Sequence, residues 1–177
     1  DLIDSAGIAR TEVFAGDYLD EPQITIISPT RDFYESLLPK FRNKLNFHWA
    51  LEALEENSYS SKDDISDETT LSKTLDDATD DTSAHNQSSI VFLLETDEKQ
   101  KFLFTGDAGR DAFNHVPQTL LGKVKDVTWM KVPHHGSKHN LDSTIIKHVN
   151  PEIAYISTEK QGKYLNRSTV FALKKNG

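Results

Sequence analysis

Several polar residues follow directly on apolar runs that are typical of β-strands, and their side chains could do chemistry. Asp107 follows the run 101–105, the pair His134 and His135 follows the run 126–132, and Ser157 follows the run 152–156. In α/β sheets, functional groups gather beyond the carboxyl ends of the strands. If these three strands are parallel, the four residues lie together at one edge of a sheet.

Asp107 belongs to the segment FTGDAG (104–109). A carboxylate just after a buried strand suits a metal bridge or a general base. The glycine before it lets the backbone approach other groups closely. The same residue could instead cap a helix that begins near Ala108, and its type alone leaves both interpretations open.

The adjacent residues His134 and His135 lie between Pro133 and Gly136, and three of the seven histidines fall within six positions. Adjacent side chains at a strand end point to opposite sides, so one ring can bind a metal while the other faces substrate or supports the site. Neutral imidazole is a common ligand of Zn and also suits Mn. The alternative is a polar surface turn that carries histidines by chance.

Three small polar residues are weaker candidates. Ser137, Ser157 and Asn166 could bind phosphate beside a metal site, although serine is common in any loop. We assign all three to substrate binding as a prediction.

The elements that must position these residues can be read from apolar periodicity and from Pro and Gly stops. Mostly buried strands alternating with helices indicate a layered α/β domain. The predicted strands are 23–28, 89–95, 101–105, 126–132 and 152–157, and the predicted helices are 32–54 with an interruption at Pro39, 109–122 with an interruption at Pro117, 142–149 and 169–175. The strands 89–95 and 101–105 flank the polar segment 97–100, which predicts a hairpin. Asp142 or Ser143 is the predicted N-cap of the helix 142–149.

Residues 55–86 differ from the rest in composition. They are rich in Ser, Thr, Asp and Glu and have few large apolar residues, so we expect a flexible acidic insertion. The chain has a formal net charge of −8, and the ten acids and two lysines between Glu55 and Asp81 account for all of it. The remainder is neutral, so charge does not argue against a nucleic-acid substrate.

The chain contains no cysteine, which excludes disulfides, thiolate metal sites and cysteine nucleophiles. This composition fits a reducing compartment, and we expect a cytoplasmic protein. No apolar run approaches the roughly 20 residues that a membrane-spanning helix needs. We therefore expect no membrane segment in this chain.

Four segments, by their order and spacing, resemble the second half of a metallo-β-lactamase-fold hydrolase. They are NQSSIVFLLE (86–95), FLFTGDAG (102–109), DVTWMKVPHHGSKHN (126–140) and VNPEIAYISTEKQGKYLN (149–166). The likeness is strongest to the hydrolase domain of competence DNA-uptake proteins, the ComEC/Rec2 family, and to its stand-alone relatives. ITIISPT (24–30) is similar to the strand before that family's variable insertion.

This resemblance implies an αββα sandwich with two divalent metal ions, Zn or Mn. Residues 1–54 and 87–177 would form the C-terminal half of that domain, with 55–86 as the insertion. Asp107 resembles the aspartate that bridges the two metals. One histidine of the Pro-His-His-Gly-Ser motif resembles a metal ligand and its neighbour a phosphate-binding or proton-donating group. We favour His135 as the ligand and His134 in the second role.

Two departures from the family pattern bear on activity. The H-x-H-x-D-H motif, which supplies most metal ligands in the family, is absent, and we expect it upstream of Asp1 or on a companion chain. Relatives often have Tyr-Gly-His-Pro where this chain reads Tyr164-Leu165-Asn166-Arg167, and Asn is a poor ligand for transition metals. A lone half would expose apolar surface, so we expect it paired with its other half or associated in an oligomer or complex.

The predicted reaction is metal-assisted hydrolysis of a phosphodiester, in nucleic acid or in a smaller phosphoester. Two metal ions would activate water and stabilise developing charge, and His134 would protonate the leaving oxygen. A binding or regulatory module that keeps the fold without catalysis is the alternative, favoured by Asn166 and the missing motif. A hydrolase of the same fold acting on thioesters or lactams also remains open.

Overall fold

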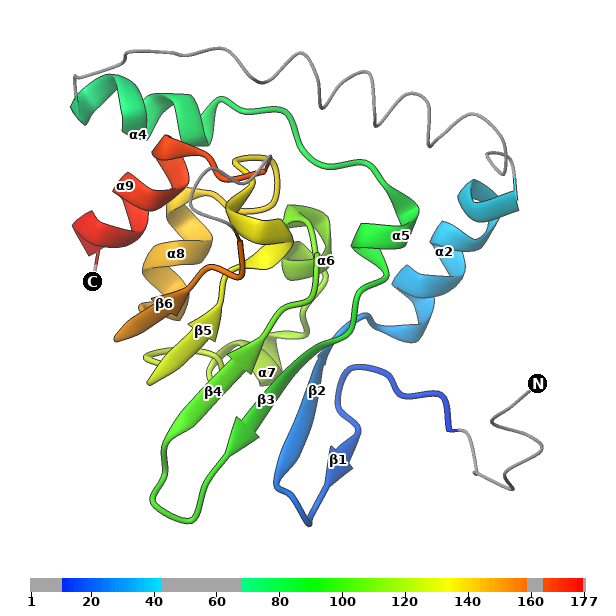
Figure 1. The fold of residues 1–177 in the computed structure, drawn as a ribbon. Coiled ribbons are helices and arrows are strands. Elements are labelled where there is room, and N and C mark those ends of the chain that lie inside the picture. Colours follow the sequence, from blue (N-terminus) through cyan, green and yellow to red (C-terminus); the bar gives the residue numbers. More distant parts are fainter. Residues whose placement is uncertain (1–10, 43–67, 159–163, 177) are drawn as a thin grey trace.

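The structure is a computed structural model of the 177-residue chain, and it describes residues 11–42, 68–158 and 164–176. Within these residues, one mixed sheet has its strands in the order of the chain (Figure 1). The strands are β1 (Tyr18–Leu19), β2 (Ile24–Ser28), β3 (Val91–Glu95), β4 (Lys101–Phe104), β5 (Trp129–Lys131) and β6 (Ile153–Tyr155).

The helices are short, and most of them lie between consecutive strands. They are α2 (Arg31–Arg42), α4 (Glu68–Asp76), α5 (Ala84–Gln87), α6 (Arg110–Asn114), α7 (Gln118–Leu121), α8 (Ser143–Val149) and α9 (Arg167–Asn176). Asp142 begins α8 as predicted, because its carboxylate accepts a hydrogen bond from the amide of Ile145 at 2.8 Å. The predicted helix 32–54 is present as far as Arg42, but the predicted interruption at Pro39 is wrong, because α2 continues through that residue. Residues 43–54 lie outside the described part.

The direction of the strands changes in the middle of the sheet. Strands β1 to β4 pair antiparallel, and the predicted hairpin of β3 and β4 is confirmed by the register Leu93 opposite Leu103. Strands β4, β5 and β6 pair parallel. Helices α6 and α7 connect the first parallel pair and α8 the second, as parallel pairing requires a crossover. The carboxyl ends of β4, β5 and β6 therefore lie at one edge.

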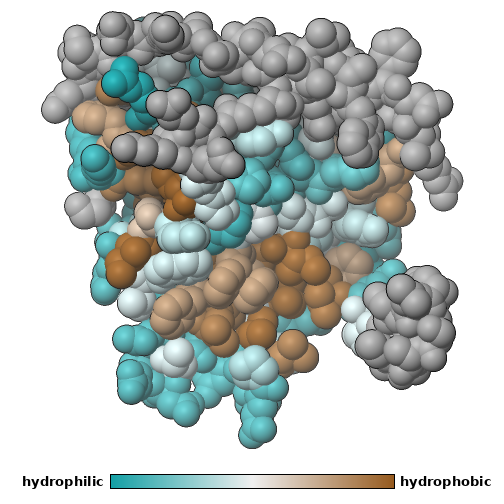
Figure 2. Space-filling model, viewed as in Figure 1, coloured by the Kyte–Doolittle hydropathy of each residue, from teal (hydrophilic) through white to brown (hydrophobic). Residues whose placement is uncertain are grey.

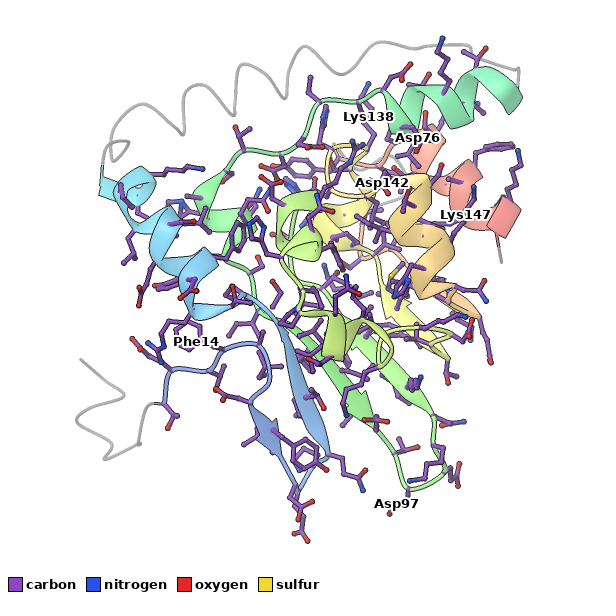
Figure 3. The ribbon with its side chains drawn as sticks, turned by 180° about the vertical axis from the view of Figure 1, so that it is seen from behind. Phe14, Asp76, Asp97, Lys138, Asp142 and Lys147 are labelled. Carbon is purple, nitrogen blue, oxygen red and sulfur yellow. The ribbon has the colours of Figure 1, made fainter. Side chains whose placement is uncertain are left out.

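One face of the sheet is covered by helices. Leu93, Leu103 and Met130 are fully buried on that face, where they join apolar residues of the helices in a single core. Helices α6, α7 and α8 lie behind the sheet in Figure 1 and in front of it in Figure 3, which is seen from the opposite side. Because side chains alternate along a strand, the residues adjacent to Leu93, Leu103 and Met130 point to the other face.

That other face carries a row of aromatic side chains. Phe92 stacks on Phe104 with ring centroids 4.7 Å apart, Phe104 lies 5.2 Å from Trp129, and Trp129 lies 5.7 Å from Tyr155. The row is incompletely covered by the described residues, since Tyr155 is 53% exposed. Figure 2 shows hydrophobic residues gathered on this face of the molecule. We refer to these four residues as the aromatic face.

The expectation of a flexible insertion over 55–86 is not met in residues 68–86. Leu75 of α4 is fully buried in the core, and Ala84 and Gln87 of α5 are also buried. Asp76 accepts hydrogen bonds from the amide and hydroxyl of Ser143 at 2.8 and 2.9 Å, which attaches α4 to the start of α8 (Figure 3). Sparse apolar residues at well-spaced positions are enough to bury this segment. Residues 55–67 lie outside the described part.

The predicted α/β class is confirmed, with a six-stranded mixed sheet and helices on one face. Short β1 was not predicted, because Tyr18 and Leu19 form too brief a run to show a period. In the described part of the chain, no helix has the length and apolar character needed to span a membrane.

Candidate functional site

The carboxyl edge of β4, β5 and β6 brings together the residues singled out in the sequence. Lys131 at the end of β5 donates to the carbonyl of Gly106 at 2.7 Å, which joins the ends of β5 and β4. The amide of His134 also donates to Gly106, at 3.3 Å. His135 donates from Nδ1 to the carbonyl of Ser157 beyond β6, at 2.6 Å. The predicted convergence at one sheet edge is confirmed.

Asp107 presents a carboxylate at this edge and does not cap a helix. The next helix, α6, begins at Arg110 with Gly109 as its N-cap, so the capping alternative is excluded. Gly106 has a φ of 55°, and a Cβ there would lie 3.0 Å from the Cβ of Ser89, so the close approach expected of this glycine is present. The Asp107 side chain is 41% exposed, which leaves its oxygens accessible.

The two histidines lie in a tight turn, Pro133–Gly136, with an unusual backbone. His134 has a φ of 42°, His135 of 54° and Gly136 of 89°, so three consecutive residues are left-handed. Such conformations cost free energy for residues with a Cβ and are found preferentially at functional sites. The turn reverses the chain immediately after β5 and directs the two rings to different partners.

The ring of His134 faces a buried cluster of polar side chains. Its Nδ1 lies 3.2 Å from Oδ1 of Asn140 and 3.4 Å from Oδ2 of Asp81. Asn140 is fully buried and donates from Nδ2 to Asp81 at 2.9 Å and to the carbonyl of Asp107 at 3.1 Å. Nδ2 of Asn86 also lies 3.5 Å from Nδ1, but it donates to Asp81 at 2.8 Å. The proton of Nδ1 therefore has two acceptors, and Nε2 is the ring atom left for substrate.

Charges around His134 influence its protonation. Burial alone would lower the pKa of the ring, but the hydrogen bond to Asp81 and the negative charges of Asp81 and Asp107 outweigh burial and raise the pKa. A ring with a raised pKa is protonated over a wider pH range. This favours a proton-donating role for His134.

The carboxylate of Asp81 is almost buried, with 10% of its side chain exposed. Burial opposes its ionisation, but hydrogen bonds from His134, Asn86, the amide of Ser83 and Asn140 more than compensate and lower the pKa to about 2. Asp81 is therefore an anion at neutral pH, fixed beside the His134 ring.

His135 has the geometry that a metal-binding histidine needs. Nδ1 donates to a backbone carbonyl, which leaves Nε2 as the ligating atom and fixes the ring orientation. The ring of Tyr164 packs against both histidines, with centroids 4.5 Å from His134 and 5.7 Å from His135. Tyr164 thus closes one side of the turn.

A cation lies beside Asp107. The Lys131 ammonium is 3.8 Å from Oδ1 of Asp107 and also contacts the carbonyl of Val132 at 3.4 Å. Burial lowers the pKa of Lys131, and the charge of Asp107 offsets part of that effect. A positive charge at this edge suits an anionic substrate.

The three predicted substrate-binding residues have different surroundings. Ser157 contacts the His135 ring through its carbonyl and, at 3.4 Å, its hydroxyl. Ser137 is buried, and its hydroxyl accepts from the amide of His139 at 3.2 Å, which stabilises the loop after the turn. Asn166 accepts from the amide of Ser168 at 2.9 Å and so caps α9. Among these three, only Ser157 directly contacts a histidine of the pair through its side chain.

Sequence reasoning missed the groups that support the histidines, namely Asp81, Asn86, Asn140, Lys131 and Tyr164. Asp81 and Asn86 both lie in the predicted insertion 55–86. The polar composition of that segment gives no sign that these two side chains pack against the histidine turn. Lys131 was read as part of a buried strand. Asn140 is the last residue of the motif PHHGSKHN (133–140). Its place in the same polar loop as His134, six residues later, is the one sequence feature that could have indicated a contact between them.

The described residues fit part of a metal centre. Asp107 offers an accessible carboxylate and His135 a correctly held imidazole, both suitable donors for Zn or Mn. In the part of the chain that the structure describes, no three side chains of His, Asp or Glu are grouped as a metal site. A stable centre needs more ligands than this edge supplies.

Comparison with known proteins finds one partial likeness. The chain is 32% identical over 84 residues to ComE operon protein 3 of Bacillus subtilis (strain 168), and the match covers 48% of this chain and 10% of that protein. The match therefore spans about a tenth of the relative's length, and it confirms a likeness to a competence-related protein. No protein-family model and no solved structure matches the chain.

Proposed function

We propose that this chain carries part of the active site of a metal-dependent hydrolase of the metallo-β-lactamase superfamily, acting on phosphodiester bonds as a nuclease or phosphodiesterase. The observation that carries the proposal is the arrangement at the carboxyl edge of β4–β6. There an accessible carboxylate, Asp107, lies near two histidines whose Nδ1 atoms are both engaged. Carboxylate and imidazole together are typical ligands of hydrolytic metal centres.

Each residue has a distinct role in this proposal. Asp107 and His135 would hold the metal ions, Zn or Mn. His134 would donate a proton to the leaving oxygen through Nε2, since Nδ1 is occupied by Asp81 and Asn140. Lys131 would attract the anionic phosphodiester and Ser157 would support His135. When bound, two metal ions would activate water and neutralise charge on the ester oxygens.

The remaining ligands would come from the N-terminal half of the same domain, upstream or on a companion chain. The aromatic face supports this arrangement. When one face of a sheet is covered by helices and the other carries large apolar side chains, that second face usually packs against a further layer of structure. Tyr155 at 53% and Ile153 at 56% exposure leave apolar surface for such a layer. An αββα sandwich would cover the aromatic face with a second sheet.

The proposal is tested by hydrolysis of a generic phosphodiester, bis(p-nitrophenyl) phosphate, by the full-length protein with Mn or Zn. We expect metal-dependent turnover that falls at least about 100-fold in Asp107→Ala. Asp111→Ala, which removes a carboxylate from neighbouring α6, is the matched control and should keep activity. Turnover that survives Asp107→Ala would overturn the role of Asp107.

A binding or regulatory module is the second candidate function. Asn166 caps α9 in place of offering a ligand, and the described residues hold no group of three ligands. Under this alternative, the full-length protein would bind nucleic acid without hydrolysing it at any Mn or Zn concentration. Gel-shift and turnover assays on the same preparation distinguish the two functions.

A further inference from the structure

The carboxylate nearest to His134 comes from a distant part of the chain, and both of its oxygens are engaged. Oδ1 of Asp81 accepts from the amide of Ser83 at 2.8 Å. Oδ2 accepts from Asn86 at 2.8 Å and from Asn140 at 2.9 Å, and it lies 3.4 Å from Nδ1 of His134. The carboxylate therefore cannot turn away from the ring without losing these bonds.

The backbone of Asp81 is fixed as well. Its amide donates to the carbonyl of His139 at 3.1 Å, and its carbonyl accepts from the side chain of Gln87. The residues before Asp81 are held by Arg110, whose buried guanidinium donates to the carbonyls of Leu75 and Ala78 at 2.7 and 3.0 Å. Side chains held this firmly are typical of groups that orient a catalytic residue.

This arrangement has a direct consequence for the ring of His134. A neutral imidazole carries one proton, and a carboxylate beside Nδ1 keeps that proton on Nδ1. Asn140 supports the same tautomer with Oδ1 at 3.2 Å, and its own orientation depends on donating to Asp81. Nε2 is then the atom that exchanges a proton with substrate.

We propose that Asp81 is a positioning residue that fixes the tautomer and orientation of His134, so that Nε2 serves the leaving oxygen. This role rests on the hydrolase function proposed above. The competing role for Asp81 is purely structural, as an anchor of residues 76–87. Neighbouring Asp80 provides the comparison, because its carboxylate pairs with Arg110 at 3.0 Å and anchors the same segment without contacting His134.

The test compares the full-length wild type with Asp81→Ala and Asp80→Ala. Nitrogen-15 NMR at a pH where the ring is neutral reports which nitrogen of His134 carries the proton, with His134→Gln used to assign the signal. We expect the Nδ1–H form to dominate in the wild type and in Asp80→Ala, and a large Nε2–H fraction in Asp81→Ala. We also expect kcat of Asp81→Ala to fall about 10- to 100-fold with KM little changed.

An unchanged Nδ1–H form of His134 in folded Asp81→Ala would overturn the proposal. Equal changes of tautomer in Asp80→Ala would overturn it too, because they would show a general effect of loosening the segment. Thermal unfolding of Asp81→Ala and Asp80→Ala measures how much stability each variant loses, so that an effect on the His134 tautomer can be separated from loosening of the fold. If the wild type hydrolyses no phosphodiester, the hydrolase function fails, while the tautomer comparison still decides whether Asp81 fixes His134.

Discussion

At the scale of single residues, the turn Pro133–Gly136 depends on a backbone that side chains rarely adopt. His134 and His135 both have positive φ, and each such residue costs on the order of 1 kcal/mol or more. Contacts of the rings with Asp81, Ser157 and Tyr164 compensate for that cost. Gly136 ends the turn with a φ of 89°, where only glycine is unstrained.

Gly136→Ala should therefore destabilise the protein. A Cβ at this position would lie 3.1 Å from Leu165 and 3.2 Å from Ile156, and its φ would be strained as well. We expect a loss of about 1–3 kcal/mol in the free energy of unfolding, measured by urea denaturation. Gly122→Ala is the control, since nothing lies within 4 Å of its added Cβ. Equal stabilities of the two variants would contradict this account of the turn.

The ionised carboxylate of Asp81 should make a pH-dependent contribution to stability. Its pKa is lowered from 3.8 to about 2 in the folded protein, so ionised Asp81 stabilises the fold above pH 3.8, and this contribution is lost as pH falls toward 2. We expect Asp81→Asn to lose about 2 kcal/mol near neutral pH, and the difference from wild type to shrink over that acidic window.

Urea denaturation at several pH values measures this difference. Asp77→Asn, an exposed change of the same charge, controls for net charge. A wild-type advantage that is constant from neutral pH to pH 2 would show that ionisation of Asp81 is not its source.

Residue types and spacing predicted the primary candidates but not their support. Asp107, His134 and His135 could be chosen because each follows a strand, and strand ends meet at a sheet edge. Asp81 and Asn140 approach His134 only through tertiary packing, which no local pattern records. The capping role of Asn166 is local, and it was not predicted because the helix was expected to begin at Thr169, whereas α9 begins at Arg167.

At the scale of elements, Arg110 joins segments that are far apart in sequence. Its guanidinium donates to the carbonyls of Leu75 in the last turn of α4 and of Ala78 just after it, and to those of Lys138 and Leu141 before α8. With the Asp80 ion pair, all three nitrogens of the group are engaged. The end of α4 and the loop after the histidine turn are therefore fixed to the start of α6.

Replacing Arg110 with Met should loosen this junction. Four carbonyl oxygens would lose a buried donor, and we expect a loss of about 3 kcal/mol in the free energy of unfolding. Hydrogen exchange should accelerate most in residues 75–81 and 138–141. Arg31→Met is the control, because the Arg31 side chain is 59% exposed and makes surface contacts, an ion pair with Glu12 at 3.8 Å and a cation–π contact with Phe14 at 4.1 Å. Exposed contacts of these kinds contribute about 0–1 kcal/mol each. Unchanged exchange in both segments would contradict the anchoring role.

Elements with strong periods were predicted correctly, and the weakly apolar ones were not. The β3–β4 hairpin and α8 have apolar runs with clear turn or cap residues, and both occur as expected. Helix α4 has few apolar residues, and its burial depends on Leu75 reaching the core. Composition averaged over 55–86 concealed that single anchor.

At the scale of the whole molecule, the sheet has one face packed against helices and another that carries the aromatic face. The candidate metal ligands Asp107 and His135 lie at the sheet edge. Among the residues that the structure describes, no three His, Asp or Glu side chains are close enough together to hold a metal ion. The proposed function takes the remaining ligands from outside this chain, so it predicts that these 177 residues alone bind Zn or Mn weakly, which isothermal calorimetry measures. Sub-micromolar Zn binding that depends on Asp107 and His135 would show that the chain completes the centre by itself.

The most direct test of the central claim is phosphodiester turnover by the full-length protein with and without Mn or Zn, in wild type, Asp107→Ala and the control Asp111→Ala. The proposed function predicts turnover that requires metal, falls at least about 100-fold in Asp107→Ala and persists in Asp111→Ala. Metal-independent turnover, or equal turnover in the two variants, would contradict it.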